Sequence, residues 1–326
     1  MRLVKLTVVL LATVGLTSLW YVATHTEIPT IPIGRVGATM NLAYVRFVGR
    51  CSRSPSYDPR SGTLSFWIAD DSGEIRVSCY GSETRALIEG HRVPALGDEI
   101  AVAGTLRVAE DFDTLTVDVP EHLIVSRVDP VDRVIGRIEL TDQYQRVRVR
   151  GEVRDVREPY QGLTLITLRD SSGAIDVAVS EDLVALSGVT PIIGIGDSVE
   201  VVAAVSRYRD TPQLVPASSA DLVQLDHPVS IASEQFIGDL SRRDIGRWFT
   251  VIGAITRMGR FSSGSQLILD DGTGAITVLL WQDVYDALPV AEKLGPGVQI
   301  EVTGEIDWYR GELEIVPEAD GVTVVE

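Results

Sequence analysis

The sequence predicts an all-β protein of three tandem barrels, each of five strands, behind one N-terminal transmembrane helix. Three observations predict it: an uncharged apolar run near the N-terminus, a pattern that recurs three times, and hydrophobic residues that alternate with polar ones inside each copy. The 326 residues carry Lys+Arg 29 against Asp+Glu 46. A net charge of -17 argues against binding nucleic acid by bulk charge alone, so any such site must be a local patch.

The first element is an apolar run from Leu6 to Ala23, which follows Arg2 and Lys5. A helix of this length just spans a hydrocarbon core of about 30 Å. The positive charges before it predict a single-pass anchor in the cytoplasmic membrane, with the C-terminal bulk extracytoplasmic. A cleaved signal peptide is the competing interpretation, although Tyr21 at the −3 position of the best cleavage site disfavours it. Both interpretations export most of the chain.

An Ile-Gly pair opens each of three copies, at Ile33, Ile135 and Ile237, 102 residues apart. A second glycine, an Asp-x-x-Gly turn and a third glycine follow at nearly constant offsets, which identifies an internal repeat. Those positions are Gly49, Gly151 and Gly253, then Asp70, Asp170 and Asp271, then Gly97, Gly196 and Gly297. Each copy is long enough to bury its own core. The expected division is a stub, anchor and linker over 1–32, then domains over 33–128, 129–230 and 231–326.

Within a copy, an alternating strand containing a glycine comes first, followed by a variable loop and a second strand. The Asp-x-x-Gly turn leads into a third strand, and a short helix and two further strands complete the copy. The expected helices are 82–87, 181–186 and 282–288. Five strands of period two, with a glycine that permits a sharp bend, are typical of a small closed barrel.

The runs V-x-V-x-G-x-V, L-x-D-x-x-G-x-I-x-V and G-x-x-V-x-V-x-x-x-V occur in the second copy at 147–153, 168–177 and 196–205. Together with the helix after the third strand, they resemble the OB-fold nucleic-acid-binding family. Its members occur in anticodon-binding domains of tRNA synthetases, in helicases and in single-strand-binding proteins. Ala203 stands where the family has glycine. The resemblance implies OB-fold barrels and a non-enzymatic binding function, whose ligand is nucleic acid, sugar or protein.

Strand parity predicts which residues face outward. In the first copy they include Trp67, Arg76 and Tyr80, beside a loop that carries three further candidates, Arg53, Tyr57 and Arg60. Stacking rings flanked by cations suit single-stranded nucleic acid. The alternative is an exposed aromatic pair without a ligand, or a docking surface.

In the third copy the outward face is apolar around Trp281, and its first loop holds Arg257, Arg260 and Phe261. Such a patch favours another protein. The alternative function is therefore an extracytoplasmic scaffold that binds protein or glycan through its barrels.

Cys51 and Cys79 align with core positions of the other copies, which predicts either free buried thiols or a disulfide across the first barrel. No catalytic motif, metal site or cofactor site is expected, because the repeated aspartates fit tight turns. The first copy contains Phe66-Trp67-Ile68-x-Asp70-x-x-Gly73-x-Ile75-x-Val77, followed by Tyr80-Gly81. With the N-terminal apolar run, this stretch resembles the membrane-anchored haem chaperone of cytochrome c maturation. That family binds haem through a His that is followed four residues later by a Tyr. In this sequence Ser126 stands four residues after His122, so haem binding is not expected.

Overall fold

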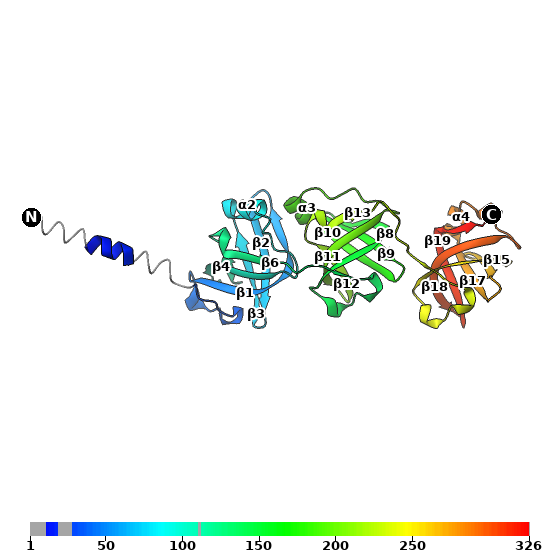
Figure 1. Cartoon of the computed structure of the whole chain (residues 1–326), viewed down its shortest axis with the longest axis horizontal. Helices are drawn as coiled ribbons and strands as arrows, with labels where there is room; N and C mark the ends of the chain where they lie inside the picture. Colours follow the sequence, from blue (N-terminus) through cyan, green and yellow to red (C-terminus); the bar gives the residue numbers. More distant parts are fainter. Residues whose placement is uncertain (1–10, 19–27, 110–111, 326) are drawn as a thin grey trace, which may run out of the picture. The chain divides into compact units, whose positions relative to one another are not determined.

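The computed structural model describes residues 11–18, 28–109 and 112–325, and most of them lie in strands (Figure 1). Residues 11–18 are helical, and none of the described helices has the length and apolar character that crossing a membrane requires. The remainder of the apolar run over 6–23 lies outside the described residues. The chain divides into two compact units, residues 1–127 and 128–326.

The first unit contains one sheet that closes on itself. Its strand order is β1-β2-β3-β5-β4-β6, and an additional pairing of β1 with β4 closes the barrel. Its elements are β1 (Tyr44–Asp58), β2 (Thr63–Asp70), β3 (Gly73–Cys79), α2 (Gly81–Glu89), β4 (Glu99–Arg107), β5 (Thr114–Thr116) and β6 (Leu123–Ser126). Two short 3-10 turns, η1 (Ile33–Arg35) and η2 (Ala38–Met40), precede β1, and η3 (Pro120–His122) precedes β6.

The second unit holds two further sheets. The first has the order β13-β11-β12-β10-β9-β8-β7 and is closed by β8 with β11. Its elements are β7 (Val131–Asp132), η4 (Ile135–Arg137), η5 (Leu140–Asp142), β8 (Arg146–Tyr160), β9 (Leu163–Asp170), β10 (Gly173–Ser180), α3 (Glu181–Ser187), β11 (Ser198–Tyr208), β12 (Thr211–Pro216), η6 (Ser219–Asp221) and β13 (Leu222–Gln224).

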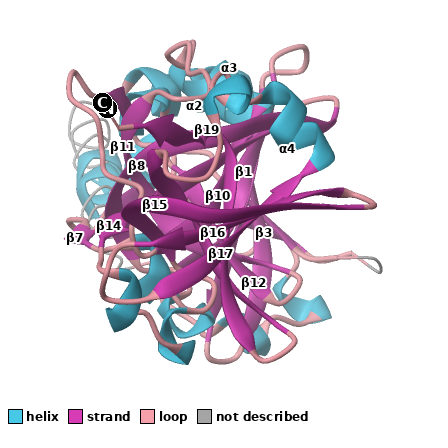
Figure 2. Cartoon of the chain, turned by 90° about the vertical axis from the view of Figure 1, so that its right-hand side faces the viewer, coloured by secondary structure: helices cyan, strands magenta, loops and turns pink. Residues whose placement is uncertain are grey.

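The last sheet has the order β14-β15-β16-β17-β19-β18 and is closed by β15 with β18. Its elements are β14 (Ser233–Glu234), η7 (Ile237–Asp239), η8 (Arg242–Asp244), β15 (Trp248–Phe261), β16 (Gly264–Asp270), β17 (Ala275–Trp281), α4 (Gln282–Ala287), η9 (Ala291–Lys293), β18 (Gln299–Tyr309) and β19 (Glu312–Val324). In all three sheets an α-helix follows the third long strand, as predicted. Figure 2 shows strands as the main element, with helices as short pieces. In the first sheet β1, β2, β3, β5 and β4 close into a five-stranded barrel, and β6 extends the sheet beyond it. In the last sheet β15, β16, β17, β19 and β18 close in the same way, and β14 lies outside the barrel. Both barrels are consistent with OB folds.

The repeated glycines lie where strands cross closely. A Cβ added to Gly49 would stand 2.5 Å from the carbonyl oxygen of Ala69, and at Gly253 it would stand 2.7 Å from that of Asp270. Both distances are shorter than real Cβ contacts, so only glycine lets the long first strand bend around the barrel.

Two motifs of the repeat bind each other. The Asp70 carboxylate accepts hydrogen bonds from the backbone amides of Ile33 (2.9 Å), Ser72 (2.7 Å) and Gly73 (3.0 Å). The same arrangement recurs at Asp170 with Ile135 and at Asp271 with Ile237. The Ile-Gly pair that opens each copy is therefore fastened to the tight turn between its second and third strands. We call this arrangement the Asp lock.

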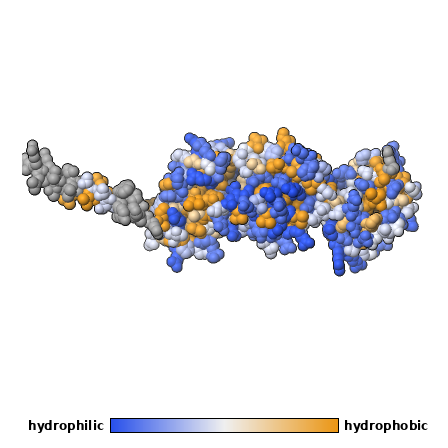
Figure 3. Space-filling view, viewed as in Figure 1, coloured by the Kyte–Doolittle hydropathy of each residue, from blue (hydrophilic) through white to orange (hydrophobic). Residues whose placement is uncertain are grey.

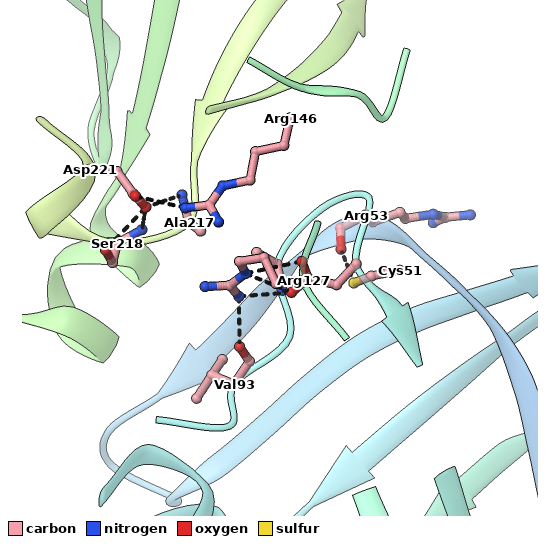
Figure 4. A network of polar contacts seen from close by, with 10 residues as sticks. Cys51, Arg53, Val93, Arg127, Arg146, Ala217, Ser218 and Asp221 are labelled. Carbon is pink, nitrogen blue, oxygen red and sulfur yellow. Dashed lines mark hydrogen bonds and ion pairs between the residues drawn. The ribbon is translucent and has the colours of Figure 1, made fainter. Parts of the chain in front are cut away.

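Both cysteines are buried free thiols, so the disulfide considered from the sequence is not formed. Cys51 is paired with Ile68 and Cys79 with Leu64, four residues away along β2, which puts the two sulfurs beyond bonding reach. The Cys51 thiol donates to the Arg53 carbonyl at 3.2 Å, while the Arg53 guanidinium points away from it (Figure 4). Burial raises the pKa of each thiol to about 12, which leaves both unreactive.

Figure 4 also shows two arginines that form hydrogen bonds at the end of a strand. Arg127 follows β6 in the first unit, and Arg146 begins β8 in the second unit. Arg127 donates to the buried carboxylate of Asp98 (2.7 Å) and to the Val93 carbonyl (3.3 Å). Arg146 donates to Asp221 at 3.0 Å, and that carboxylate also accepts from the backbone of Ser218.

Within the second unit, Trp248 lies under two arginines of the preceding barrel. The Arg169 Cζ lies 4.4 Å from the centroid of the Trp248 ring, and the Arg154 Cζ lies 5.6 Å from it. Arg154 also forms ion pairs with Glu318 and Asp320 of β19. The Trp248 side chain is buried, so the contact is a desolvated junction.

Candidate nucleic-acid interface

One row of side chains crosses all five strands of the first barrel. Arg53 of β1 is opposite Trp67 of β2, which is opposite Arg76 of β3. Arg76 is in register with Thr114 of β5, and Thr114 with Arg107 of β4. Paired residues of a sheet share a face, and the neighbours of this row along β2 and β3 are buried core residues. The row therefore lies on the outer face.

Two arginines of this row, Arg53 and Arg76, lie against aromatic rings. The Arg53 Cζ lies 4.4 Å from the Trp67 ring centroid, and the Arg76 Cζ lies 5.8 Å from that of Phe112, whose ring is half exposed. Arg53 also pairs with Glu74. The face thus combines partly exposed rings, on which planar bases stack, with guanidinium groups that bind phosphate.

A row of hydroxyl groups runs beside the cationic one. Ser56, Ser65, Ser78 and Thr116 are successive register partners on β1, β2, β3 and β5, and Thr105 of β4 is opposite Thr116. Ser65 accepts a hydrogen bond from Arg76 at 3.2 Å, which holds that guanidinium over the sheet. Ser78 is buried, and the other hydroxyls provide neutral donors and acceptors next to the arginines.

Four of the predicted residues share this face, and two do not. Tyr80 follows β3 on the same side as Arg76, with its ring half exposed. Arg53 and Tyr57 lie in β1 and not in the predicted loop, because the strand continues to Asp58. Tyr57 is opposite the buried Leu64, because register shifts in β1 reverse its face. Arg60 lies in the exposed turn between β1 and β2.

Phe112 and Arg107 escaped the sequence prediction. They belong to the face through the parallel pairing of β3 with β5, which joins segments far apart in the sequence. The sequence shows Phe112 shortly after the alternating pattern of β4. That position alone does not indicate which face of the sheet the ring covers.

The third barrel presents a different surface. Phe261 and Trp281 lie on either side of Gly264 in register, and their exposed rings meet edge to face with centroids 6.1 Å apart. Arg257 and Arg260 are exposed at the same end, and the Arg260 Cζ lies 5.9 Å from the Tyr285 ring. Arg257 is opposite Ile268, on the side of the sheet that carries Phe261 and Trp281, whereas Arg260 is opposite the buried Ser265 and lies on the other side. The prediction that the first loop holds Arg257, Arg260 and Phe261 was wrong, because β15 continues to Phe261.

Carboxylates border this surface along β18 and β19. Burial raises the pKa of Glu314, and the nearby Asp307 and Glu312 raise it further. Negative charge at this border disfavours a polyanion.

The arginines of the second barrel are neutralised by neighbours. Arg150 pairs with Glu200 at 2.7 Å, and Arg157 pairs with Asp155 at 2.8 Å and Asp176 at 2.7 Å. This barrel therefore offers less free positive charge than its arginine content suggests.

Residues 249–320 match the family model described as an OB-fold nucleic acid binding domain. The match covers most of the third barrel. No curated protein matches the chain.

Segments of the chain are similar to parts of solved structures at low sequence identity. The S. pombe Stn1–Ten1 complex is 23% identical over 24% of this chain and 58% of that chain, with a TM-score of 0.22. A replication protein A heterotrimer bound to ssDNA is 20% identical over 24% and 57%, with a TM-score of 0.21. Asparaginyl-tRNA synthetase from Pyrococcus horikoshii is 18% identical over 28% and 23%, with a TM-score of 0.26. The match thus spans less than two thirds of the length of each of these three chains.

Proposed function

We propose that the protein is a non-enzymatic binding protein that engages single-stranded nucleic acid through the outer face of its first barrel. The observation that carries the proposal is the row Arg53–Trp67–Arg76 across three adjacent strands. The family match at 249–320 supports nucleic acid as the ligand class. An acidic chain needs such a local concentration of arginine, because its overall charge repels a polyanion.

In this proposal one base stacks on Trp67 and another on Phe112, and phosphates bind the arginines between them. Each stacked base contributes about 1–3 kcal/mol. A phosphate must compete with Glu74 for Arg53, since those two side chains are already paired. Neutralising Glu74 should therefore tighten binding.

The test is a titration of a fluorescent 20-mer of single-stranded DNA, then RNA, followed by anisotropy and tryptophan quenching. Trp67→Ala should weaken binding about 5- to 150-fold. Arg76→Gln should lower the slope of log affinity against log salt by about 0.7. Glu74→Gln should tighten binding, and Trp281→Ala, which removes an exposed ring of the third barrel, is the matched control. Absence of binding at low salt, or equal loss in the control, would refute the proposal.

The exposed Phe261–Trp281 pair with its acidic border favours a second candidate function, a scaffold that binds protein or glycan. Apolar contact of this kind should be nearly insensitive to salt and should be lost in Trp281→Ala. An affinity that falls steeply with salt would instead indicate that the partner binds the arginine row of the first barrel.

We also propose that the apolar run over 6–23 attaches the chain to the cytoplasmic membrane with its barrels outside. The support is the sequence of that run and the positive residues before it. The full chain should stay with membranes during alkaline extraction, and external protease should reach the barrels in intact cells. Release by alkali, or full protection from protease, would contradict this placement.

A further inference from the structure

The loop that follows α3 exposes three large aliphatic side chains. Val189, Ile192 and Ile195 are 87%, 95% and 69% exposed, within seven residues. The loop lies between Gly188 and Gly196, and residues 183–196 include no charged side chain. Soluble surfaces rarely gather such side chains without a binding role.

The corresponding loops of the other copies bury their apolar residues. In the first barrel, Ala95 and Leu96 are buried just before the glycine that opens β4. In the third, Leu288 is buried, and Leu294 packs against the core. Exposure is therefore a property of the second copy and not of this position in the fold.

An apolar groove of about 510 Å³ lies behind the loop. The β8–β9 hairpin and α3 form its walls, with Val156, Ile166 and Val184 among the lining residues, and Ile193 of the loop contributes as well. The volume is within the range of ligand-sized pockets, about 300–1,000 Å³. Figure 3 shows hydrophobic surface along the edge of the second unit where Figure 1 labels α3.

The rim of the groove is acidic. Glu158 and Glu181 both line it beside the hairpin tip. The Gly162 amide donates to Glu158 Oε1 at 3.3 Å, and the Glu181 amide donates to the Gly162 carbonyl at 2.8 Å, which holds both residues at this tip. In sequence, Asp182 and Asp197 add negative charge at the two ends of the uncharged stretch.

We propose that this loop and groove bind an amphipathic helix of a partner protein, with an apolar face and a basic flank. The aliphatic side chains and the groove take the apolar face, in the manner of helix-in-groove recognition. The carboxylates select the basic flank by charge complementarity. The same carboxylates repel an anionic lipid surface, which favours a helix over a bilayer. This site is separate from the residues of the proposed nucleic-acid face.

The test uses the full chain and a fluorescein-labelled 14-residue helix with leucines at i, i+3, i+4 and i+7 and lysines elsewhere. We expect saturable binding that weakens about tenfold or more in the double variant Val189→Ser, Ile192→Ser. Glu158→Gln with Glu181→Gln should weaken binding at low salt and have less effect at high salt. Ile124→Ser, an exposed aliphatic of the first barrel, is the matched control.

Fold integrity does not limit this test, because the substituted side chains are on the surface and circular dichroism reports any loss of structure. A peptide with glutamates in place of the lysines should bind at least tenfold more weakly. Four outcomes would overturn the proposal. They are no binding of the lysine peptide, equal binding by the Val189→Ser, Ile192→Ser variant, and two outcomes in place of peptide binding. These two are sedimentation with phosphatidylcholine vesicles that this variant abolishes, and self-association that it abolishes.

Discussion

At the scale of single residues, the carboxylate of Asp271 shows how one side chain fixes two segments. It accepts hydrogen bonds from the amides of Ile237, Thr273 and Gly274, at 2.8, 2.8 and 3.1 Å. Partial burial raises the pKa of Asp271, but these donors and the Thr273 hydroxyl outweigh burial and lower the pKa to about 2. The ionised form is therefore the one that the folded barrel requires.

A depressed pKa makes stability depend on pH with a definite sign. The stabilisation from Asp271 is complete above its ordinary pKa of 3.8 and is lost as the pH falls through about 2. We expect Asp271→Asn to lower the melting temperature of the chain at pH 7, with the difference from wild type shrinking between about pH 4 and pH 2. Thermal melts across that range measure it. Asp270→Asn, the adjacent carboxylate without the Ile237 contact, is the control, and an unchanged difference at all pH values would contradict the mechanism.

On the candidate nucleic-acid face of the first barrel, the sequence predicted the positions of some residues and not of others. Strand parity placed Trp67, Arg76 and Tyr80 correctly, because β2 and β3 are regular between the turns. The loop predicted for Arg53 and Tyr57 was wrong, because β1 continues to Asp58 with register shifts between Cys51 and Ser56. The positions of bulges depend on contacts between strands, and the local sequence does not specify those contacts.

At the scale of elements, one position in β4, β11 and β18 shows how closely each of these strands approaches its neighbour in the barrel. A Cβ on Gly104 would lie 2.1 Å from the Thr116 carbonyl oxygen, and on Gly304 it would lie 2.7 Å from the Val316 carbonyl. The second copy has Ala203 there, opposite Pro216 and buried. That barrel therefore accommodates a methyl group that the other two do not.

Exchanging these residues should have unequal effects. Gly104→Ala forces the β4–β5 pairing apart and should lower the free energy of unfolding by about 1–3 kcal/mol. Ala203→Gly removes one methyl group and adds chain entropy in the unfolded state, which costs about 1 kcal/mol. Denaturant melts of the two variants provide the comparison. Equal losses would show that the strand crossing is no tighter in the first barrel.

The order of elements followed from the sequence more fully than their pairing did. The Asp-x-x-Gly turns and the helices after the third strands are local features, and the structure has them where the motifs predicted. The parallel pairing of β5 with β3 is not local, and it determines that Phe112 and Arg107 join the candidate face.

At the scale of the whole molecule, the second unit contains a junction between barrels that the repeat did not predict. Trp248 is buried beneath Arg154 and Arg169, and burial lowers the pKa of Arg169. Arg154 is largely buried and Arg169 partly buried, so both need the Trp248 ring to offset desolvation, and Arg154 is also paired with Glu318 and Asp320.

Removing the ring should therefore uncouple unfolding within this unit. Trp248→Ala leaves the two arginines without their aromatic contact, and we expect the calorimetric transition of the second unit to broaden or divide in two. Trp308→Ala is the matched control, because the Arg242 Cζ lies 3.9 Å from its ring centroid within one barrel. A single transition shared by wild type and the Trp248 variant would contradict the coupling.

The Asp lock also determines how the chain would respond to mechanical load. Tension applied through the segment that enters the first barrel meets the backbone bonds of Pro29 and Ile31 to Arg46 of β1, and then the bond of the Ile33 amide to Asp70. Each later barrel has the same two attachments in the same order, with Arg133 bonded to Arg148 before the locked Ile135, and Gln235 bonded to Thr250 before the locked Ile237. The three locks would thus act as second anchor points, each holding its barrel together after the pairing before it has given way.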